Sequence, residues 1–172
     1  MILGTDRCLK LVGEAKLVEN LAERELKAPD VGFDLRIGEL YEVVGSGFLH
    51  ADERETPELK LVAKQGKAVL APGRAYVMKT VEKVNVPGNI IGIILPRSTL
   101  YRSGIILSAG IADPGYKGEL SFGISNLGPK PFEMEIGARV AHILFFEVRG
   151  KTTAYRGKWQ GGRVSAKRER QV

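Results

Sequence analysis

Arg97 and Ser98 stand together where an apolar run ends, in the segment Pro-Arg-Ser-Thr-Leu. The planar guanidinium of Arg97 offers donors that suit phosphate oxygens, and the Ser98 hydroxyl adds another. At the end of a strand, where the chain turns, such a pair predicts a phosphate site that needs no glycine-rich loop. The alternative is that Arg97 pairs with a surface carboxylate, which is the commoner fate of an isolated Arg-Ser pair.

Asp113 is the second candidate and lies in the segment Ser-Ala-Gly-Ile-Ala-Asp-Pro-Gly-Tyr. Asp before Pro-Gly is an ordinary turn signature, and taken alone the segment favours that interpretation. A partly desolvated carboxylate beside a bound phosphate would instead orient and deprotonate a water for attack on phosphorus. The groups around Asp113 must decide between the two.

Other mechanisms lack the residues that they need. Two histidines (His50 and His142) and a single cysteine (Cys8) cannot supply the ligands of a zinc nucleobase deaminase. The sequence contains neither a P-loop nor a Gly-x-Ser-x-Gly elbow. Because one cysteine forms no internal disulfide and charges interrupt every apolar run, we expect a soluble, cytoplasmic protein without a membrane partner.

The basic charge is concentrated at the C-terminus. The net charge is +6, and residues 150–172 contain seven basic side chains against one acid (7 − 1 = +6), so the rest is neutral. The tail is a solvated terminus, a nucleic-acid arm or a flap over an anionic ligand. No helix-turn-helix or aromatic platform accompanies it, so nucleic acid is the weaker prediction.

The 172 residues predict one domain, residues 1–149, followed by the tail, residues 150–172. Thr5 or Asp6 is predicted to cap a short helix, and Glu14–Lys27 is also compatible with a helix. Glycine and proline then separate short β-rich runs, which predicts a sandwich or barrel. Residues 46–57 are polar and acidic and predict a loop or a mobile hairpin tip. The strand candidates are Phe33–Ile37, Lys60–Leu70, Ala75–Val84, Ile90–Leu95, Gly104–Leu107, Glu119–Ser125, Phe132–Ile136 and Ala138–Val148.

Four separated segments resemble, in order, the motifs of the dUTPase family: VGFDLRIGEL, PRSTL, AGIADPGYKGEL and GARVAHILFF. The opening MILGTDRCLK and the stretch LAPGRAYVMKTVEKVNVPGNIIG are similar to the dCTP deaminase branch of the same superfamily. The resemblance spans most of the chain. It implies a mainly β fold, a distorted jelly roll or β-barrel of the dUTPase type with short N-terminal helices. It also implies a homotrimer with active sites between subunits, a C-terminal flap, and Mg²⁺ bound mainly through the substrate triphosphate.

The resemblance also implies roles for the matched residues. Asp113 would position the attacking water, and Tyr116 would stack under deoxyribose. Asp34 would hold a metal-bound water or support the site, without ligating metal directly. His142 stands where the family has glutamine, and a lone histidine beside an apolar strand is more often structural. The substrate-binding residues would be Arg97, Ser98, Thr99, Arg102, Ser108, Ala109, Gly110, Tyr116 and His142, joined by Arg156, Trp159 and Arg163 of the tail.

One position separates the two branches of the superfamily. Deaminases use a glutamate in the strand after Asp-Pro-Gly, and the matching residue here is Gly123, which cannot carry a proton. Glu119, on the same strand face, would lie roughly 13 Å away at about 3.3 Å per residue, outside proton-transfer reach. Ser98 and Arg102 nevertheless match residues that assist deamination, and the tail YRGKWQGGRVS is closer to the deaminase tail.

We therefore predict a dUTP diphosphatase that hydrolyses dUTP to dUMP and pyrophosphate by metal-assisted attack of a water activated by Asp113. A dCTP deaminase or a bifunctional enzyme of the same superfamily remains an alternative. A non-catalytic, nucleotide-binding regulatory trimer and a nucleic-acid-binding protein also remain open.

Overall fold

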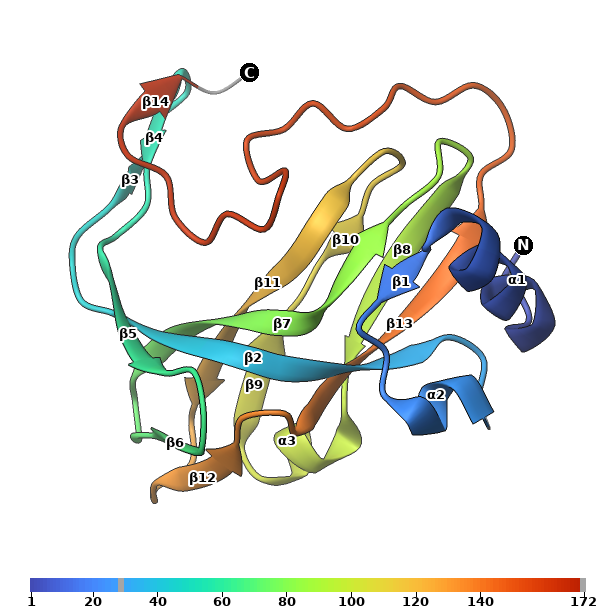
Figure 1. The fold of residues 1–172 in the computed structure, drawn as a ribbon. Coiled ribbons are helices and arrows are strands. Elements are labelled where there is room, and N and C mark those ends of the chain that lie inside the picture. Colours follow the sequence, from blue (N-terminus) through green and yellow to red (C-terminus); the bar gives the residue numbers. More distant parts are fainter. Residues whose placement is uncertain (28–29, 171–172) are drawn as a thin grey trace.

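The computed structural model describes residues 1–27 and 30–170, which form a mainly β structure with short helices (Figure 1). In these ranges the helices are α1 (Thr5–Ala15), α2 (Glu23–Lys27) and α3 (Ser98–Arg102). The strands are β1 (Val18–Glu19), β2 (Phe33–Val43), β3 (Phe48–Leu49), β4 (Glu53–Glu55), β5 (Leu59–Ala63), β6 (Lys67–Leu70), β7 (Ala75–Asn85), β8 (Ile90–Pro96), β9 (Ile105–Ser108), β10 (Ile111–Ala112), β11 (Lys117–Asn126), β12 (Phe132–Glu135), β13 (Arg139–Glu147) and β14 (Glu169–Arg170). Among the described residues, no helix combines the length and apolarity that a membrane span requires.

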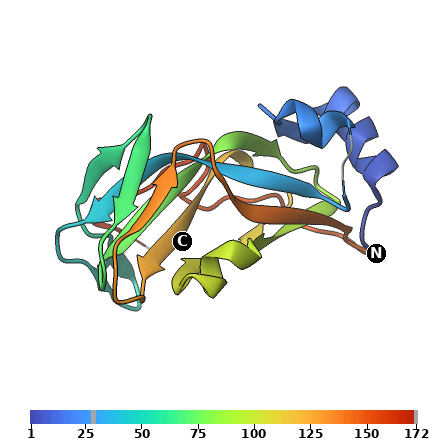
Figure 2. The same cartoon turned by 90° about the horizontal axis from the view of Figure 1, so that it is seen from below.

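The main sheet is antiparallel and runs in the order β10-β8-β13-β2-β7-β11-β9, with β1 beside β7 and β5 beside β2. It curls around the core as a half-barrel (Figure 2), so the predicted jelly-roll or barrel class is confirmed. Side chains that alternate between the two faces of each strand form the core. In β7, every second side chain from Tyr76 to Val84 is buried. Phe33 of β2 and Phe145 of β13 meet edge to face, with ring centroids 6.5 Å apart.

The N-terminal helices differ from the prediction in two ways. Gly4 is the N-cap of α1 and makes no side-chain cap, while the predicted caps Thr5 and Asp6 lie inside the helix, where the Thr5 hydroxyl donates to the Asp30 carbonyl at 2.8 Å. The helix expected over Glu14–Lys27 is interrupted, since Lys16 adopts a left-handed conformation with φ 51°. This turn directs the fully buried Leu17 into the core, and β1 and α2 follow.

The short helix α3 was not indicated by the sequence. It occupies the connection from β8 to β9, and its Leu100 is buried while the neighbouring Tyr101 is exposed. Gly104, with φ 73°, then returns the chain to β9. The Arg-Ser-Thr segment therefore lies on a turn of helix at one end of the sheet (Figure 1).

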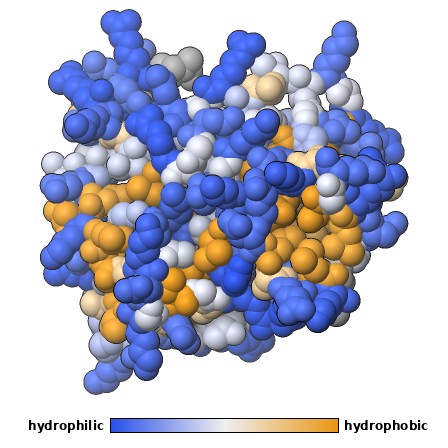
Figure 3. Space-filling view, viewed as in Figure 1, coloured by the Kyte–Doolittle hydropathy of each residue, from blue (hydrophilic) through white to orange (hydrophobic). Residues whose placement is uncertain are grey.

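Residues 46–57 were predicted to form a loop or a hairpin tip, and they contain the β3–β4 hairpin. The tail pairs with this hairpin. Strand β14 pairs with β4, placing Glu169 opposite Arg54. The tail leaves β13, crosses the upper edge of the sheet and ends at this hairpin (Figure 1). The upper part of this face, where tail and hairpin lie, is mostly hydrophilic, whereas apolar side chains gather in patches below it (Figure 3).

Candidate active site

A cavity of about 440 Å³ lies between the outer face of the sheet and the tail. Its sheet side is formed by Val77 of β7, by Gly110 and Ile111, and by Leu120, Ser121, Phe122 and Gly123 of β11. Asp113 and Tyr116 flank it, and the tail covers it with Tyr155, Trp159, Arg163 and Val164. The structure thus brings five predicted site residues to one cavity: Gly110, Asp113, Tyr116, Trp159 and Arg163.

Asp113 begins a tight turn and also faces the cavity. Its backbone carbonyl accepts a hydrogen bond from Tyr116 N at 3.0 Å, and Gly115 has φ 86°, so Asp-Pro-Gly does form a turn. Within the described part of the chain, however, no hydrogen bond or ion pair engages the Asp113 carboxylate, which is the only acidic side chain lining the cavity. A carboxylate in this position is available to a water or a ligand.

Tyr116 supports the wall beside Asp113. Its hydroxyl donates to the Glu119 carbonyl at 2.6 Å, and its ring meets Tyr155 of the tail edge to face at 5.4 Å. Burial, with smaller contributions from Tyr155 and Glu119, raises the pKa of Tyr116 to about 12. The side chain is therefore a neutral, apolar platform at physiological pH.

The tail is fastened to the turn by backbone contacts. Tyr155 N donates to Pro114 O at 2.7 Å, and Gly161 N donates to Lys117 O at 2.9 Å. The Gln160 side-chain amide accepts from Lys117 N at 2.9 Å and donates to Gly115 O at 3.2 Å. These contacts hold residues 155–161 directly over the Asp113 segment.

A second set of contacts holds the end of the tail to the β3–β4 hairpin. Arg168 donates to Glu53 at 2.7 Å, and Arg54 donates to Glu169 at 3.0 Å. Two guanidinium groups lie near the Trp159 ring, with Arg54 Cζ 5.2 Å and Arg163 Cζ 6.0 Å from its centroid. Trp159, the predicted aromatic lid, therefore lines the cavity from the tail and makes cation–π contacts there.

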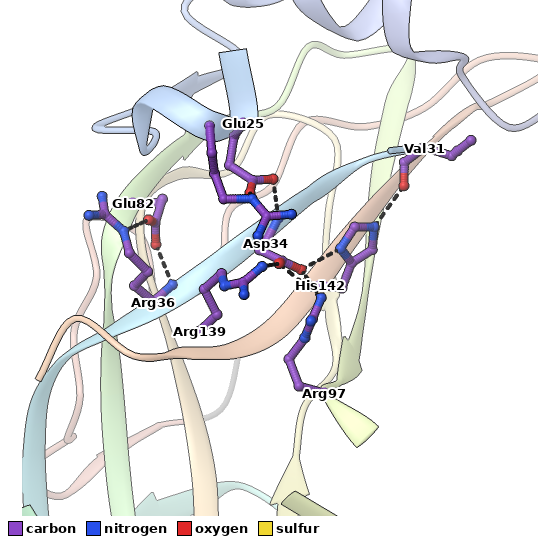
Figure 4. Close-up of polar contacts among 9 residues, drawn as sticks. Glu25, Val31, Asp34, Arg36, Glu82, Arg97, Arg139 and His142 are labelled. Atoms are coloured by element: carbon purple, nitrogen blue, oxygen red, sulfur yellow. Dashed lines mark hydrogen bonds and ion pairs between the residues drawn. The ribbon is translucent and has the colours of Figure 1, made fainter. Parts of the chain in front are cut away.

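Two other predicted residues, Arg97 and His142, meet the Asp34 carboxylate (Figure 4), and none of the three lines the cavity. Arg97 Nη1 donates to Asp34 Oδ1 and Oδ2 at 2.7 and 2.8 Å, and Arg139 Nη1 donates to Oδ2 at 2.8 Å. His142 bridges Asp34 Oδ1, at 2.9 Å from Nδ1, and the Val31 carbonyl, at 2.7 Å from Nε2. Arg97 thus does pair with a carboxylate, but a buried one.

Asp34 is 4% exposed, and its neighbours keep it ionised. Burial alone would raise the pKa of Asp34, but the hydrogen bond from His142, the charge of Arg97 and the hydrogen bond from Arg139 together hold it below the ordinary 3.8. Both carboxylate oxygens already accept two hydrogen bonds each from these three side chains. Asp34 therefore does not fit the expected role of holding a metal-bound water, and it fits the alternative role of supporting Arg97.

The remaining predicted residues lie outside the cavity lining. Ser98, Thr99 and Arg102 are exposed on α3, and Arg156 is exposed on the tail. Ser108 of β9 pairs with Gly123 of β11 next to the cavity, and Ala109 packs against the core. No group of three metal-binding side chains was found among residues 1–27 and 30–170.

Within one chain the two groups of residues are far apart. Ala112, beside Asp113, pairs with Gly92 near the start of β8, whereas Arg97 directly follows the end of that strand. Five residues at about 3.3 Å each separate the two positions by roughly 16 Å. The Asp113 cavity and the Arg97 group cannot act on one small ligand in a single subunit.

Sequence reasoning missed Arg139. Strict strand alternation puts residues 139 and 142 on opposite faces, because they are three positions apart. A bulge in β13 between Arg139 and Ala141 shifts the register and leaves Val140 and Ala141 both buried, so Arg139 reaches the same carboxylate as His142. The motif letters GARVAH contain the arginine, but the bulge that aims it has no clear sequence signal.

Glu119 does not replace the missing glutamate at position 123. Its carboxylate lies 3.8 Å from Lys79 Nζ and 3.6 Å from Lys83 Nζ, and it does not line the cavity. Gly123, by contrast, lines the cavity and carries no side chain there.

Comparison with known proteins finds relatives of this chain by sequence and by structure. A family model described as dCTP deaminase-like matches residues 2–148. The chain belongs to the dCTP deaminase-like family. This family membership assigns it to the enzymes of the dUTPase/dCTP deaminase superfamily.

Relatives in this family have names from both branches. A probable deoxyuridine 5'-triphosphate nucleotidohydrolase of Methanothermobacter thermautotrophicus is 31% identical over 87% of this chain and 99% of its own length. A dCTP deaminase of Pyrococcus furiosus is 32% identical over 84% of this chain and 85% of its own length. Sequence similarity alone therefore does not separate the two activities.

Solved structures show the same fold at low identity. The 2'-deoxycytidine 5'-triphosphate deaminase from Agrobacterium tumefaciens aligns with a TM-score of 0.65 at 21% identity, over 84% of this chain and 47% of that one. The EIAV dUTPase aligns with a TM-score of 0.50 at 17% identity, over 83% of this chain and 92% of its own.

Proposed function

We propose that this chain is a dUTP diphosphatase. The observation that supports the proposal best is the composition of the cavity: it contains the free carboxylate of Asp113, while the position where deaminases of the family carry glutamate is Gly123. A pocket with a base for water and no proton carrier near the nucleobase suits phosphate hydrolysis rather than deamination.

In the proposed reaction Asp113 accepts a proton from a water as that water attacks the α-phosphorus of dUTP. A bond forms between the water oxygen and phosphorus, and the bond to the bridging oxygen breaks, so dUMP and pyrophosphate are released. Tyr116 packs against the sugar, and the docked tail keeps other water out of the cavity. The cationic group of Arg97 and Arg139 stabilises the negative charge of the phosphates.

This scheme requires Asp113 and Arg97 from different subunits, because one chain holds them too far apart. A homotrimer would join the α3 end of one subunit to the cavity of its neighbour. Large apolar side chains that such an assembly could bury are exposed on β8, α3, β9 and β10 and after β11: Leu95, Tyr101, Ile106, Ile111 and Leu127. We therefore propose a trimer with composite active sites.

Mg²⁺ is proposed to enter with the triphosphate. The described residues supply no protein cluster for it, and the oxygens of Asp34 are occupied by Arg97, Arg139 and His142. When bound, the ion would offset the charge of the phosphate oxygens.

Complementation between two inactive variants tests the composite site. Arg97→Ala and Asp113→Asn are each expected to lose most dUTP turnover as homotrimers. In trimers assembled from an equal mixture, a site is intact when its Asp113 comes from the first variant and its Arg97 from the second. Random assembly gives ½ × ½, about a quarter of wild-type activity. Mixed trimers that remain inactive would contradict the composite site.

Deamination of dCTP is the second candidate, because relatives of similar identity carry that name. Incubating the protein with dUTP and dCTP in parallel and identifying the products separates the two activities. We expect dUMP and pyrophosphate from dUTP and no uracil nucleotide from dCTP. Binding without turnover of either nucleotide would instead indicate a regulatory trimer.

A further inference from the structure

Ser121 lines the cavity and carries a polar group that no other group of the protein uses. Its Oγ is buried and has no hydrogen-bond partner, and it is the one buried side-chain polar atom in this condition among residues 1–27 and 30–170. An unpartnered buried hydroxyl costs folding free energy, so its retention calls for an explanation such as a ligand.

The strand places Ser121 on the cavity side of the sheet. Leu120 and Phe122, its neighbours in β11, are buried in the core, so Ser121 and Gly123 share the opposite face. Gly123 pairs with Val77 of β7, and both line the cavity together with Ser121.

The surface next to Ser121 is open enough for a flat ring. A Cβ placed at Gly123 would have its nearest neighbour, Ser108 Cβ, at 3.4 Å, which is ordinary contact distance. Val77 and Trp159 supply apolar walls, and neither Ser121 nor Gly123 brings a charge. Such surroundings suit the neutral base of a nucleotide better than its phosphates.

A serine hydroxyl can hydrogen-bond uracil and cytosine equally well. Its hydrogen rotates, so it can donate to a carbonyl oxygen or accept from an amino group. Uracil and cytosine differ in this respect at position 4, where one carries an oxygen and the other an amino group. A serine hydroxyl at the base edge therefore accepts either pyrimidine.

We propose that Ser121 is a specificity-determining residue whose hydroxyl hydrogen-bonds the polar edge of the bound pyrimidine and admits both uracil and cytosine nucleotides. This inference rests on the proposed function, because it assumes that the nucleotide base occupies this cavity. It adds that cytosine nucleotides compete for the site even where they are not converted.

Calorimetric titration with dUMP and with dCMP tests the proposal without relying on turnover. Wild-type protein should bind both nucleotides with dissociation constants within about fivefold of each other. Ser121→Ala should weaken both by about 5- to 10-fold, the effect of losing one hydrogen bond. Its melting temperature should stay level or rise, because the folded protein loses only an unpartnered hydroxyl.

Ser125→Ala is the matched control, since Ser125 lies on the same face of β11 but outside the cavity lining. It should bind both nucleotides as the wild type does. Unchanged binding by Ser121→Ala, or wild-type protein that binds dUMP and rejects dCMP, would overturn the inference. The proposed function is judged separately by the products formed from dUTP, so it can fail while the base contact stands.

Discussion

Asp34 and Arg97 are 63 positions apart in the sequence, yet Arg97 Nη1 donates to both oxygens of the Asp34 carboxylate, at 2.7 and 2.8 Å. The carboxylate comes from β2 and the guanidinium from the end of β8, on either side of β13. The contact therefore joins three strands through one buried charge, and β13 adds Arg139 and His142 to it.

Asp34→Asn is expected to destabilise the protein by about 2–4 kcal/mol, because the amide directs a donor at side chains that are themselves donors and leaves two cations without their counter-charge. Urea denaturation at neutral pH measures the change. Glu133→Gln is the matched control: its partner Lys67 is exposed, and the loss of that pair should leave the free energy of unfolding nearly unchanged. Equal effects of the two substitutions would contradict the assigned importance of the Asp34 group.

The Asp34 contribution should depend on pH in a defined direction. Because the pKa of Asp34 is lower in the folded protein than the ordinary 3.8, the unfolded chain takes up the proton first as the pH falls. The stabilisation is thus complete above that value and is lost as the pH falls through the folded pKa. The stability difference between wild type and Asp34→Asn should be constant from about pH 5 to 7 and shrink only below about pH 4. A difference that already shrinks near pH 6 would refute this assignment.

Asp113→Asn should reduce dUTP hydrolysis by roughly 10²–10⁴ while nucleotide binding survives, because the amide keeps the size of the side chain and removes the base. Pyrophosphate release and dUMP titration measure the two effects. Asp52→Asn, at an exposed position near the hairpin tip, should leave both unchanged. If Asp113→Asn hydrolyses dUTP at the wild-type rate, Asp113 serves only the turn.

Gly118→Ala should release the tail from the cavity. Gly118 has φ 139°, and a Cβ there would lie 2.7 Å from Gly162 N, so the added methyl group collides with backbone and not with a flexible side chain. Trp159, the single tryptophan, reports the change through its fluorescence. Gly88→Ala, where a Cβ meets nothing within 4 Å, is the control. An unchanged emission spectrum in Gly118→Ala would show that the tail tolerates the methyl group.

Much of the β structure could be predicted because its strands obey simple alternation. Each predicted strand segment overlaps an observed strand, although Lys60–Leu70 is divided into β5 and β6 and β2 runs on to Val43. The helix expected over Glu14–Lys27 fails because a favourable local composition is outweighed by burial of Leu17 after a left-handed turn at Lys16. Tertiary packing, not propensity, sets that boundary.

The candidate site could be predicted only in part. Asp113, Tyr116 and Trp159 meet at one cavity as the motifs indicated, since two of them flank a turn and the third lies on the tail that covers it. Arg139 was not predicted, because a bulge in β13 puts its side chain on the sheet face opposite to the one that strict alternation predicts. Ser121 was not predicted, because the lack of a hydrogen-bond partner for its hydroxyl can be seen only in the folded structure.

The tail contacts have a kinetic consequence. Residues 150–170 are held at both ends, by β13 on one side and by the pairing of β14 with β4 on the other, so they form a loop with two fixed ends and not a free terminus. When residues 155–161 lift from the Asp113 turn, the hairpin contacts keep them close, which gives a high effective concentration for reclosure. Because both ends of the segment stay fixed, it also gains little conformational entropy when it opens. The cavity should therefore open in brief, frequent excursions, because a segment tethered at both ends recloses quickly.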